Sequence, residues 1–148
     1  MPRHFQDKLI YRIIDANINR AKEGLRVCEE INRFILNNRA LSAGFKTLRH
    51  DLNRVALKGF PVVNILVKER DSVKDIGRTL YASELKRRNI EDIFWASLSR
   101  VKESVRVLEE FSKLISVETA VKLKGIRYRL YELEKKAVKE IARLRNLK

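Results

Sequence analysis

The sequence predicts an all-α protein, a four-helix bundle-like domain made of two helical hairpins. Apolar residues recur at three- and four-residue steps over long stretches, which is the period of amphipathic helices. Only five glycines and two prolines interrupt 148 residues. The chain also repeats itself at a distance of 80 residues. Two similar hairpins, each with an apolar face that it cannot bury alone, are expected to pack face to face.

The first hairpin is expected to hold two helices. The apolar period runs from Leu9 to Leu36 and ends at Asn37-Asn38, a pair typical of turns. The second helix is expected from about Ser42 to Leu57. Lys58-Gly59 then end it, and Pro61 prevents its continuation because proline lacks the backbone N–H donor.

A long irregular crossover, about residues 60–88, is expected between the hairpins. Its first part, Pro61–Val67, is short and β-branched and predicts an extended segment or a lone strand. A charged loop follows over Lys68–Arg78. The second hairpin then contributes a helix from about Ile90 to Ile115 and another from Val117 to the C-terminus.

The repeat supports a pseudo-twofold relation between the hairpins. Residues 16–35 and 96–115 are identical at 9 of 20 positions. Phe45–Leu52 and Leu123–Leu130 match at three of eight, including Arg49 with Arg127. Two units are too few for a solenoid, which needs at least three. We therefore expect one domain over residues 1–148, with its repeats at about 9–57 and 90–146.

Composition limits the classes of function. Lys and Arg number 33 against 19 Asp and Glu, so the net charge is +14. Such a charge favours an anionic partner, which nucleic acid, an acidic membrane or a phosphorylated metabolite would each satisfy. One cysteine, Cys28, excludes an internal disulfide and is expected in the core. No apolar run is long enough for a membrane span and no signal segment is visible, so a cytoplasmic protein is expected. The high charge content resembles that of thermophile proteins.

Four arginines occupy matched places near apolar helix faces. If a twofold axis relates the hairpins, we expect them to converge in or near the bundle core. They are Arg20, Arg49, Arg100 and Arg127. The nearest carboxylates are Glu23, Glu30, Glu103 and Glu110. A buried guanidinium is costly unless it is paired. One interpretation is an Arg–Glu network that fixes the register of the bundle, and the other is a clamp that binds phosphate through guanidinium forks.

Two further features leave alternatives open. Gly24 lies one turn beyond Arg20 and predicts either room for a ligand or a close helix crossing. The segment Asp75-Ile-Gly77-Arg78 is compatible with a phosphate-binding turn that carries a carboxylate for Mg²⁺, and equally with an ordinary surface turn. The sequence contains no P-loop, GxGxxG, HExxH or CxxC motif.

Several segments together resemble one family. They are Arg12–Phe34, Leu48-Arg-His-Asp-Leu52, Asp75-Ile-Gly77 and Ser99–Phe111, and the resemblance covers about residues 12–135. The family is that of the small helical hydroxymethylpyrimidine-phosphate kinases of thiamin biosynthesis, which occur alone or fused to the N-terminus of thiamin phosphate synthase. The resemblance implies phosphorylation of 4-amino-5-hydroxymethyl-2-methylpyrimidine phosphate to its diphosphate, with ATP and Mg²⁺. Because 148 residues are too few for a (β/α)₈ barrel, the resemblance does not imply synthase activity.

Phosphoryl transfer needs cations around the transferred group and a carboxylate-held Mg²⁺. The catalytic candidates on these grounds are Arg20, Arg100, Glu23 and Glu103. Candidates for binding the substrate or its phosphate are Asn17, Asn19, Arg26, Arg49, Arg106, Arg127, Gly77 and Arg78. Asp15 and Asp75 are the candidates for Mg²⁺, and Glu23 or Glu103 could also hold it. Asn17 and Asn19 suit the aminopyrimidine edge because an amide both donates and accepts hydrogen bonds.

Two other classes of function remain open from the sequence. A basic nucleic-acid-binding module is one, because six cations cluster near the C-terminus: Lys135, Lys136, Lys139, Arg143, Arg145 and Lys148. A non-catalytic partner of a separate thiamin phosphate synthase is the other. A homodimer is compatible with a helical bundle of this size, and no membrane association is expected.

Overall fold

The computed structural model describes residues 3–61, 63–79 and 81–147. The described residues form five α-helices and no strand: α1 Arg3–Glu30, α2 Arg39–Gly59, α3 Val63–Lys68, α4 Ile90–Ser112 and α5 Val117–Ala142. A π-helical turn, Ile31–Ile35, extends α1, and short 3₁₀ turns occupy Ile76–Arg78, Ala82–Leu85 and Arg143–Asn146. The predicted all-α, bundle-like fold with a long crossover is confirmed.

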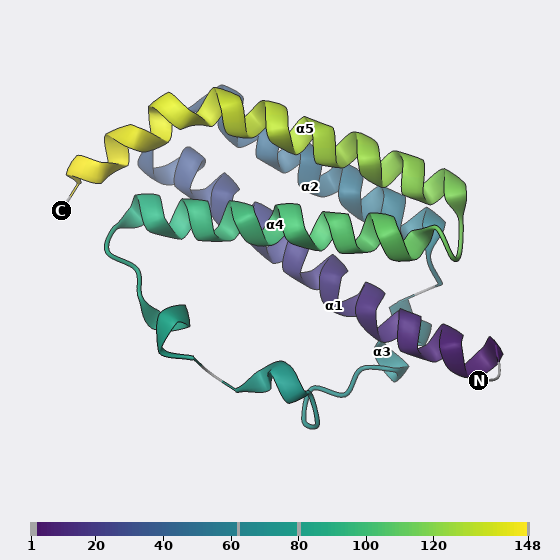
Figure 1. Ribbon diagram of the computed structural model, residues 1–148. Coiled ribbons are helices and arrows are strands. Elements are labelled where there is room, and N and C mark those ends of the chain that lie inside the picture. The colour runs from purple at the N-terminus through teal and green to yellow at the C-terminus, as the bar shows by residue number, and fades with distance from the viewer. Residues whose placement is uncertain (1–2, 62, 80, 148) are drawn as a thin grey trace.

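The four long helices form a closed ring (Figure 1). Helix α1 packs against α2 and α4, and α5 packs against the same two helices. The contact between α1 and α4, the first helices of the two hairpins, is the most extensive. The crossover leaves α2, passes outside α1 and α4, and returns to the start of α4 (Figure 1). One side of the α1–α4 pair therefore faces the crossover instead of another helix.

The core draws on all four long helices. Fully buried side chains include Leu25 of α1, Leu48 of α2, Leu98 of α4 and Leu130 of α5. Phe45 and Phe94 meet edge to face with ring centroids 5.8 Å apart. Cys28 lies in this core as predicted, and burial raises the pKa of its thiol to about 12. A thiol held in the protonated form is a poor nucleophile, so Cys28 serves packing.

Side-chain caps set the helix starts. Asn38, Asn89 and Ser116 each accept a backbone N–H three residues further on, at the starts of α2, α4 and α5. Asn37, with φ of 50°, adopts the left-handed conformation that makes the turn between α1 and α2. Helix α1 begins earlier than predicted and turns π-helical after Glu30, and α4 ends three residues before the predicted Ile115.

The prediction of an extended segment at Pro61–Val67 is wrong over its described part. Residues 63–68 form the helix α3, which contacts α1 and buries Leu66, and Val62 lies outside the described residues. An isolated strand leaves its backbone groups without partners, whereas a helical turn bonds them internally. This requirement overrides the weak β preference of Val and Ile.

Gly24 marks the closest approach of α1 and α4. A Cβ atom at Gly24 would lie 2.5 Å from Cγ2 of Val101 and 2.8 Å from the backbone oxygen of Ser97. Ser104, the repeat equivalent of Gly24, is also small and buried. A close helix crossing, one of the two explanations predicted for Gly24, therefore applies.

We expect Gly24→Ala to lower the free energy of unfolding by about 1–3 kcal/mol, because the added methyl group overpacks the crossing. Gly125→Ala is the matched control, since nothing lies within 4 Å of a Cβ at that exposed helical position. It should stabilise the protein by up to about 1 kcal/mol through helix propensity. Urea unfolding followed by circular dichroism measures both, and a Gly24→Ala variant as stable as the control variant would contradict the crossing.

Candidate functional site

A cleft of about 550 Å³ opens between α1 and the crossover. We call it the Arg20 cleft. It brings together six of the predicted site residues: Asp15, Asn17, Asn19, Arg20, Glu23 and Asp75. Leu9, Ile13 and Ala16 of α1 supply an apolar part of its wall, and the crossover supplies Arg70, Asp71 and Ser72. The α1 residues of the cleft share one face of that helix, and the path of the crossover brings Asp75 to them.

An ion pair holds the crossover over this cleft. Nε of Arg70 lies 2.7 Å from Oδ2 of Asp15, and Nη2 of Arg70 lies 2.8 Å from Oδ1. The Asp15 side chain is only 10% exposed. Such a bidentate contact is strong and directional. Because Arg70 engages both carboxylate oxygens, Asp15 holds the crossover in place, and Asp75 is the more open of the two predicted Mg²⁺ ligands.

The two asparagines differ in burial. Asn17 is buried and donates from Nδ2 to the backbone oxygen of Ile13, 2.8 Å away, so its orientation is fixed. Asn19 is half-buried and makes no side-chain hydrogen bond within the described residues.

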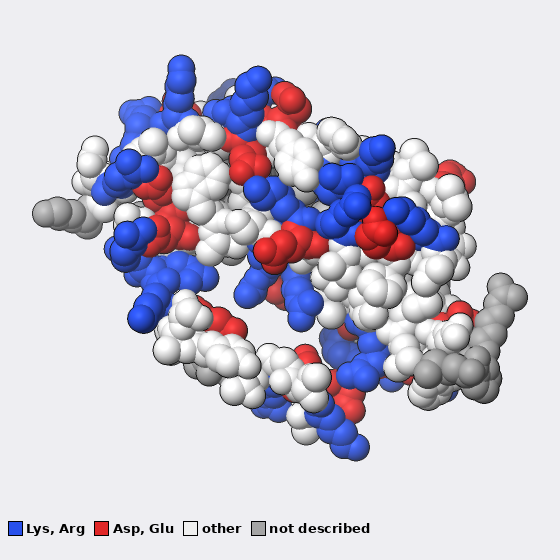
Figure 2. Space-filling model, viewed as in Figure 1, with Lys and Arg blue, Asp and Glu red and all other residues white. Residues whose placement is uncertain are grey.

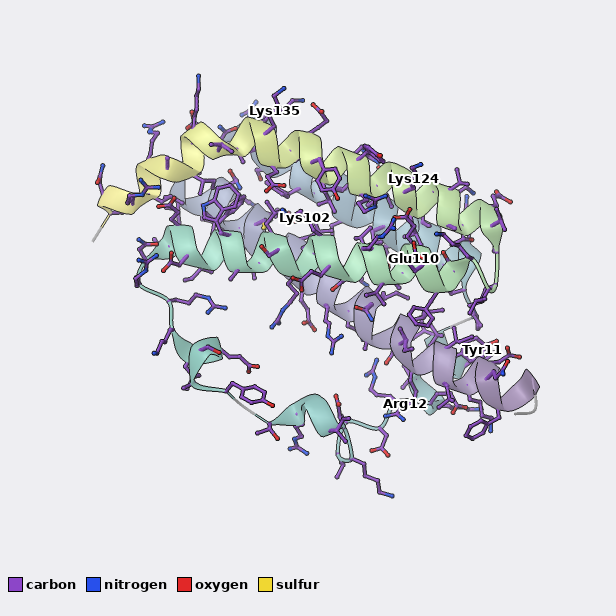
Figure 3. All side chains as sticks on the ribbon, viewed as in Figure 1. Tyr11, Arg12, Lys102, Glu110, Lys124 and Lys135 are labelled. Atoms are coloured by element: carbon purple, nitrogen blue, oxygen red, sulfur yellow. The ribbon has the colours of Figure 1, made fainter. Side chains whose placement is uncertain are left out.

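Arg12, which the sequence argument missed, also lines the cleft and points from α1 toward the crossover (Figure 3). It shares a helix face with Ala16 and Asn19, which is the signal that would have identified it.

The predicted phosphate turn is a capped 3₁₀ turn. Oδ1 of Asp75 accepts the backbone N–H of Gly77 at 2.9 Å. Gly77 and Arg78 are exposed and do not line the cleft, whereas Asp75 does. Only the carboxylate of this motif therefore meets the other site residues.

A second cleft, of about 440 Å³, lies beside the α1–α4 crossing. We call it the Arg100 cleft. Helix α1 contributes Glu23, Gly24 and Val27, α4 contributes Ala96, Ser97 and Arg100, and the later crossover contributes Glu84 and Arg87. Glu23 lines both clefts. Figure 2 shows the space between the crossover and the bundle, with charged side chains of both signs around it.

The predicted convergence of four arginines in or near the core is wrong for Arg20 and Arg100. Arg20 and Arg100 are exposed and belong to separate clefts, and Arg49 and Arg127 lie in neither cleft. The physical reason is that, among the described residues, no long helix covers the crossover side of α1 and α4, so guanidinium groups at the edge of an apolar face reach water. Glu103 is also exposed and lines neither cleft.

Arg49 and Arg127 instead form two matched ion pairs with carboxylates that sequence reasoning missed. Nε of Arg49 lies 2.9 Å from Oε2 of Glu29, and Nε of Arg127 lies 2.6 Å from Oε2 of Glu109. Glu29 and Glu109 are 1% and 4% exposed. Both stand at the same place in the repeat, and that identity was the available signal. Each pair joins the two helices of one hairpin, through a carboxylate that is not one of the four expected from the sequence.

The same carboxylates engage the remaining predicted arginines. Arg26 contacts Glu29 and Glu30, and its repeat equivalent Arg106 contacts Glu109 and Glu110. Burial opposes ionisation of Glu109, but hydrogen bonds and charge from Arg127 and Arg106 outweigh it and lower the pKa. The roles predicted for Arg26, Arg49, Arg106 and Arg127 in substrate binding remain predictions.

Three wider observations concern metal, membrane and nucleic acid. No group of three or more His, Cys, Asp or Glu residues poised for a metal occurs within the described ranges. No helix in that part of the chain is long and apolar enough to cross a membrane. In the basic C-terminal cluster, Arg143 pairs with Glu140 and Arg145 pairs with the buried Glu91. Those two cations are therefore partly neutralised within the fold.

The Glu109 pair predicts a specific acid response. Because its folded pKa lies below the usual value for glutamate, about 4.3, its stabilisation is complete above that value and is lost as the pH falls through the lowered pKa. Glu109→Gln should be less stable at neutral pH and lose less stability below about pH 5. Urea unfolding across this range tests it, with Glu132→Gln as control, because Glu132 is exposed and forms no ion pair with a described residue. Parallel curves for wild type and Glu109→Gln would contradict the expectation.

The Asp15–Arg70 pair predicts the order of the crossover. Arg70→Gln leaves a nearly buried carboxylate without its partner, which costs about 1–3 kcal/mol. We expect chymotrypsin to cleave faster at the exposed Tyr81 in this variant, because the crossover opens more often. Lys74→Gln removes one positive charge from the same segment and should leave cleavage unchanged. Equal cleavage of both variants would show that the pair does not hold the crossover.

Comparison with known proteins places the chain in a family. The model of the ThiD2 family matches residues 12–136. A thiamine-phosphate synthase of Rhodopirellula baltica is 40% identical over 147 residues, and one of Nostoc punctiforme is 41% identical over 128. These alignments cover 96% and 86% of this chain but only 39% and 35% of the relatives, so the chain spans little more than a third of their length. No solved structure gives a significant match. On the extent of these matches, the chain belongs to the ThiD2 family.

Proposed function

We propose that this protein phosphorylates 4-amino-5-hydroxymethyl-2-methylpyrimidine phosphate to its diphosphate with ATP, as a step of thiamin biosynthesis. Membership of the ThiD2 family and the similarity to proteins named thiamine-phosphate synthase support the biosynthetic context. The observation that carries the proposal is the Arg20 cleft. It combines an apolar wall, two amides, cations and carboxylates under a pinned crossover.

The proposed reaction joins two phosphates. An oxygen of the acceptor phosphate attacks the γ-phosphorus of ATP, and the bond from that phosphorus to the β–γ bridging oxygen breaks, with its electrons remaining on ADP. The acceptor phosphate has a second pKa of about 6 and is largely ionised at neutral pH, so it needs no general base. The protein must instead bring two polyanions together, which is a task of positioning and charge neutralisation.

The Arg20 cleft supplies groups suited to the acceptor. Leu9, Ile13 and Ala16 offer an apolar surface for a methylated ring. Asn17 and Asn19 offer amide groups for the amino and ring-nitrogen edge. Arg12 and Arg20, which form no ion pair within the described residues, are suited to its phosphate.

The carboxylates present fit a magnesium ion that is held largely by substrate. Mg²⁺ commonly binds one or two protein carboxylates, several waters and substrate phosphates. Glu23, Asp71 and Asp75 face the Arg20 cleft and would supply these carboxylates. When bound, the ion would neutralise charge on the phosphates. The protein's own part is then to orient the acceptor through its amides and arginines.

The test is direct. Purified protein is incubated with ATP, Mg²⁺ and the pyrimidine phosphate, and diphosphate formation is followed by anion-exchange chromatography. We expect turnover by wild type and roughly 10- to 100-fold lower kcat/KM for Arg20→Gln, the loss expected for a charge-assisted hydrogen bond. Lys135→Gln, a remote and exposed charge change on α5 (Figure 3), should retain full activity.

The same preparations separate the competing functions. No turnover by wild type would reject the kinase. RNA binding that weakens steeply with salt and is reduced in Lys135→Gln would then favour the nucleic-acid module. Stable binding to a separate thiamin phosphate synthase without turnover would favour a non-catalytic partner. Homodimerisation remains a prediction, which sedimentation of the same sample checks.

A further inference from the structure

The Arg100 cleft contains side chains of both charge signs that form no ion pairs with one another. Four charged residues line this cleft: Arg87, Arg100, Glu23 and Glu84. None of them forms an ion pair with a described residue. The hydrogen bond that Arg87 makes, from Nη1 to the backbone oxygen of Lys86, is local. Opposite charges that share a cleft without pairing remain available to a ligand that carries both signs.

A magnesium-complexed phosphate chain is such a ligand. Its phosphate oxygens suit guanidinium forks, and its metal suits carboxylates. We propose that the Arg100 cleft binds the magnesium-complexed triphosphate of the nucleotide donor, while the Arg20 cleft binds the acceptor. This inference rests on the proposed function and assigns its two substrates to two separate places.

The repeat explains why two such clefts exist. Arg20 and Arg100 are equivalent positions, and so are Asn17 and Ser97. Each cleft therefore carries the same arginine from one of two related helices, and Gly24 of the crossing lines the Arg100 cleft. Serine in place of asparagine removes an amide that suits a pyrimidine edge. The Arg100 cleft accordingly retains the cation and loses the group suited to a base.

Glu23 fixes where the two ligands would meet. It is the residue that the two linings share. Phosphates bound in both clefts would approach each other beside its carboxylate, where repulsion between them is greatest. Glu23 is suited to keep the metal there, so that its substitution should weaken metal-dependent binding more than metal-free binding.

Binding measurements test the assignment without turnover. The probe is the magnesium complex of an ATP analogue with an imido group in place of the β–γ bridging oxygen, titrated calorimetrically. We expect Arg100→Gln and Arg87→Gln each to weaken its binding roughly 10- to 100-fold, with little effect on the pyrimidine phosphate. Arg20→Gln should show the reverse preference. Glu23→Gln should reduce the gain in analogue affinity that Mg²⁺ provides.

The matched control is Arg88→Gln. Arg88 is the neighbour of Arg87 and carries the same charge, but it is bound to Asp92 and lines neither cleft. It should bind both probes as wild type does. Wild-type affinity in both Arg100→Gln and Arg87→Gln would overturn the inference. So would equal loss of both probes in Arg100→Gln, or failure of wild type to bind the analogue.

The outcome is separable from that of the proposed function. A wild type that forms the diphosphate, with Arg87 and Arg100 variants unchanged in analogue affinity and in KM for ATP, would retain the kinase and reject the cleft assignment. If wild type binds the analogue but forms no diphosphate, and both variants lose analogue binding, the kinase is rejected and the cleft assignment is retained.

Discussion

The close crossing of α1 and α4 at Gly24 determines how the rest of the molecule is arranged. A Cβ there would meet Val101 and the Ser97 backbone, so the two helices approach as closely as their backbones allow. Because the helices cross in this way, one side of the pair faces α2 and α5 and forms the core. The other side is left for polar residues, and it carries both clefts. Packing and candidate chemistry thus have a common geometric origin.

The crossover lies over the side of α1 and α4 that the other long helices leave uncovered. It makes few buried contacts of its own, since residues from Ser72 to Thr79 are exposed. It is held at its start by Leu66 of α3 and by the Arg70–Asp15 pair. A segment attached at its ends and exposed between them is of the kind that opens locally at low free-energy cost. That property would allow ligands to enter and leave the Arg20 cleft beneath the crossover.

The long helices were predictable because apolar period, caps and the repeat all indicate the same elements. The helix at Val63–Lys68 was not, because β-branched residues favour a strand until the absence of a partner is known. For the site, six of the predicted residues meet in one cleft. The placement of Arg20 and Arg100 failed because a helical wheel gives the direction of a side chain but not which faces are covered. Glu29 and Glu109 were missed because a carboxylate beside an apolar helix face is expected to be exposed to water. Only the position of its arginine partner in the fold shows that it is buried and paired.

The repeat contains two sets of matched arginines with different roles, which the net charge alone does not distinguish. Arg49 and Arg127 each form an ion pair with a buried carboxylate within their own hairpin, and these pairs hold the helices together. Arg20 and Arg100, equally matched in sequence, face open clefts and form no ion pair with described residues. The 33 positive residues therefore include one symmetric pair of arginines that is already neutralised and another that is available. An anion recognised by the second set must be small enough to enter a cleft beneath the crossover. That requirement favours a phosphorylated metabolite over a nucleic-acid duplex, which needs an exposed basic face.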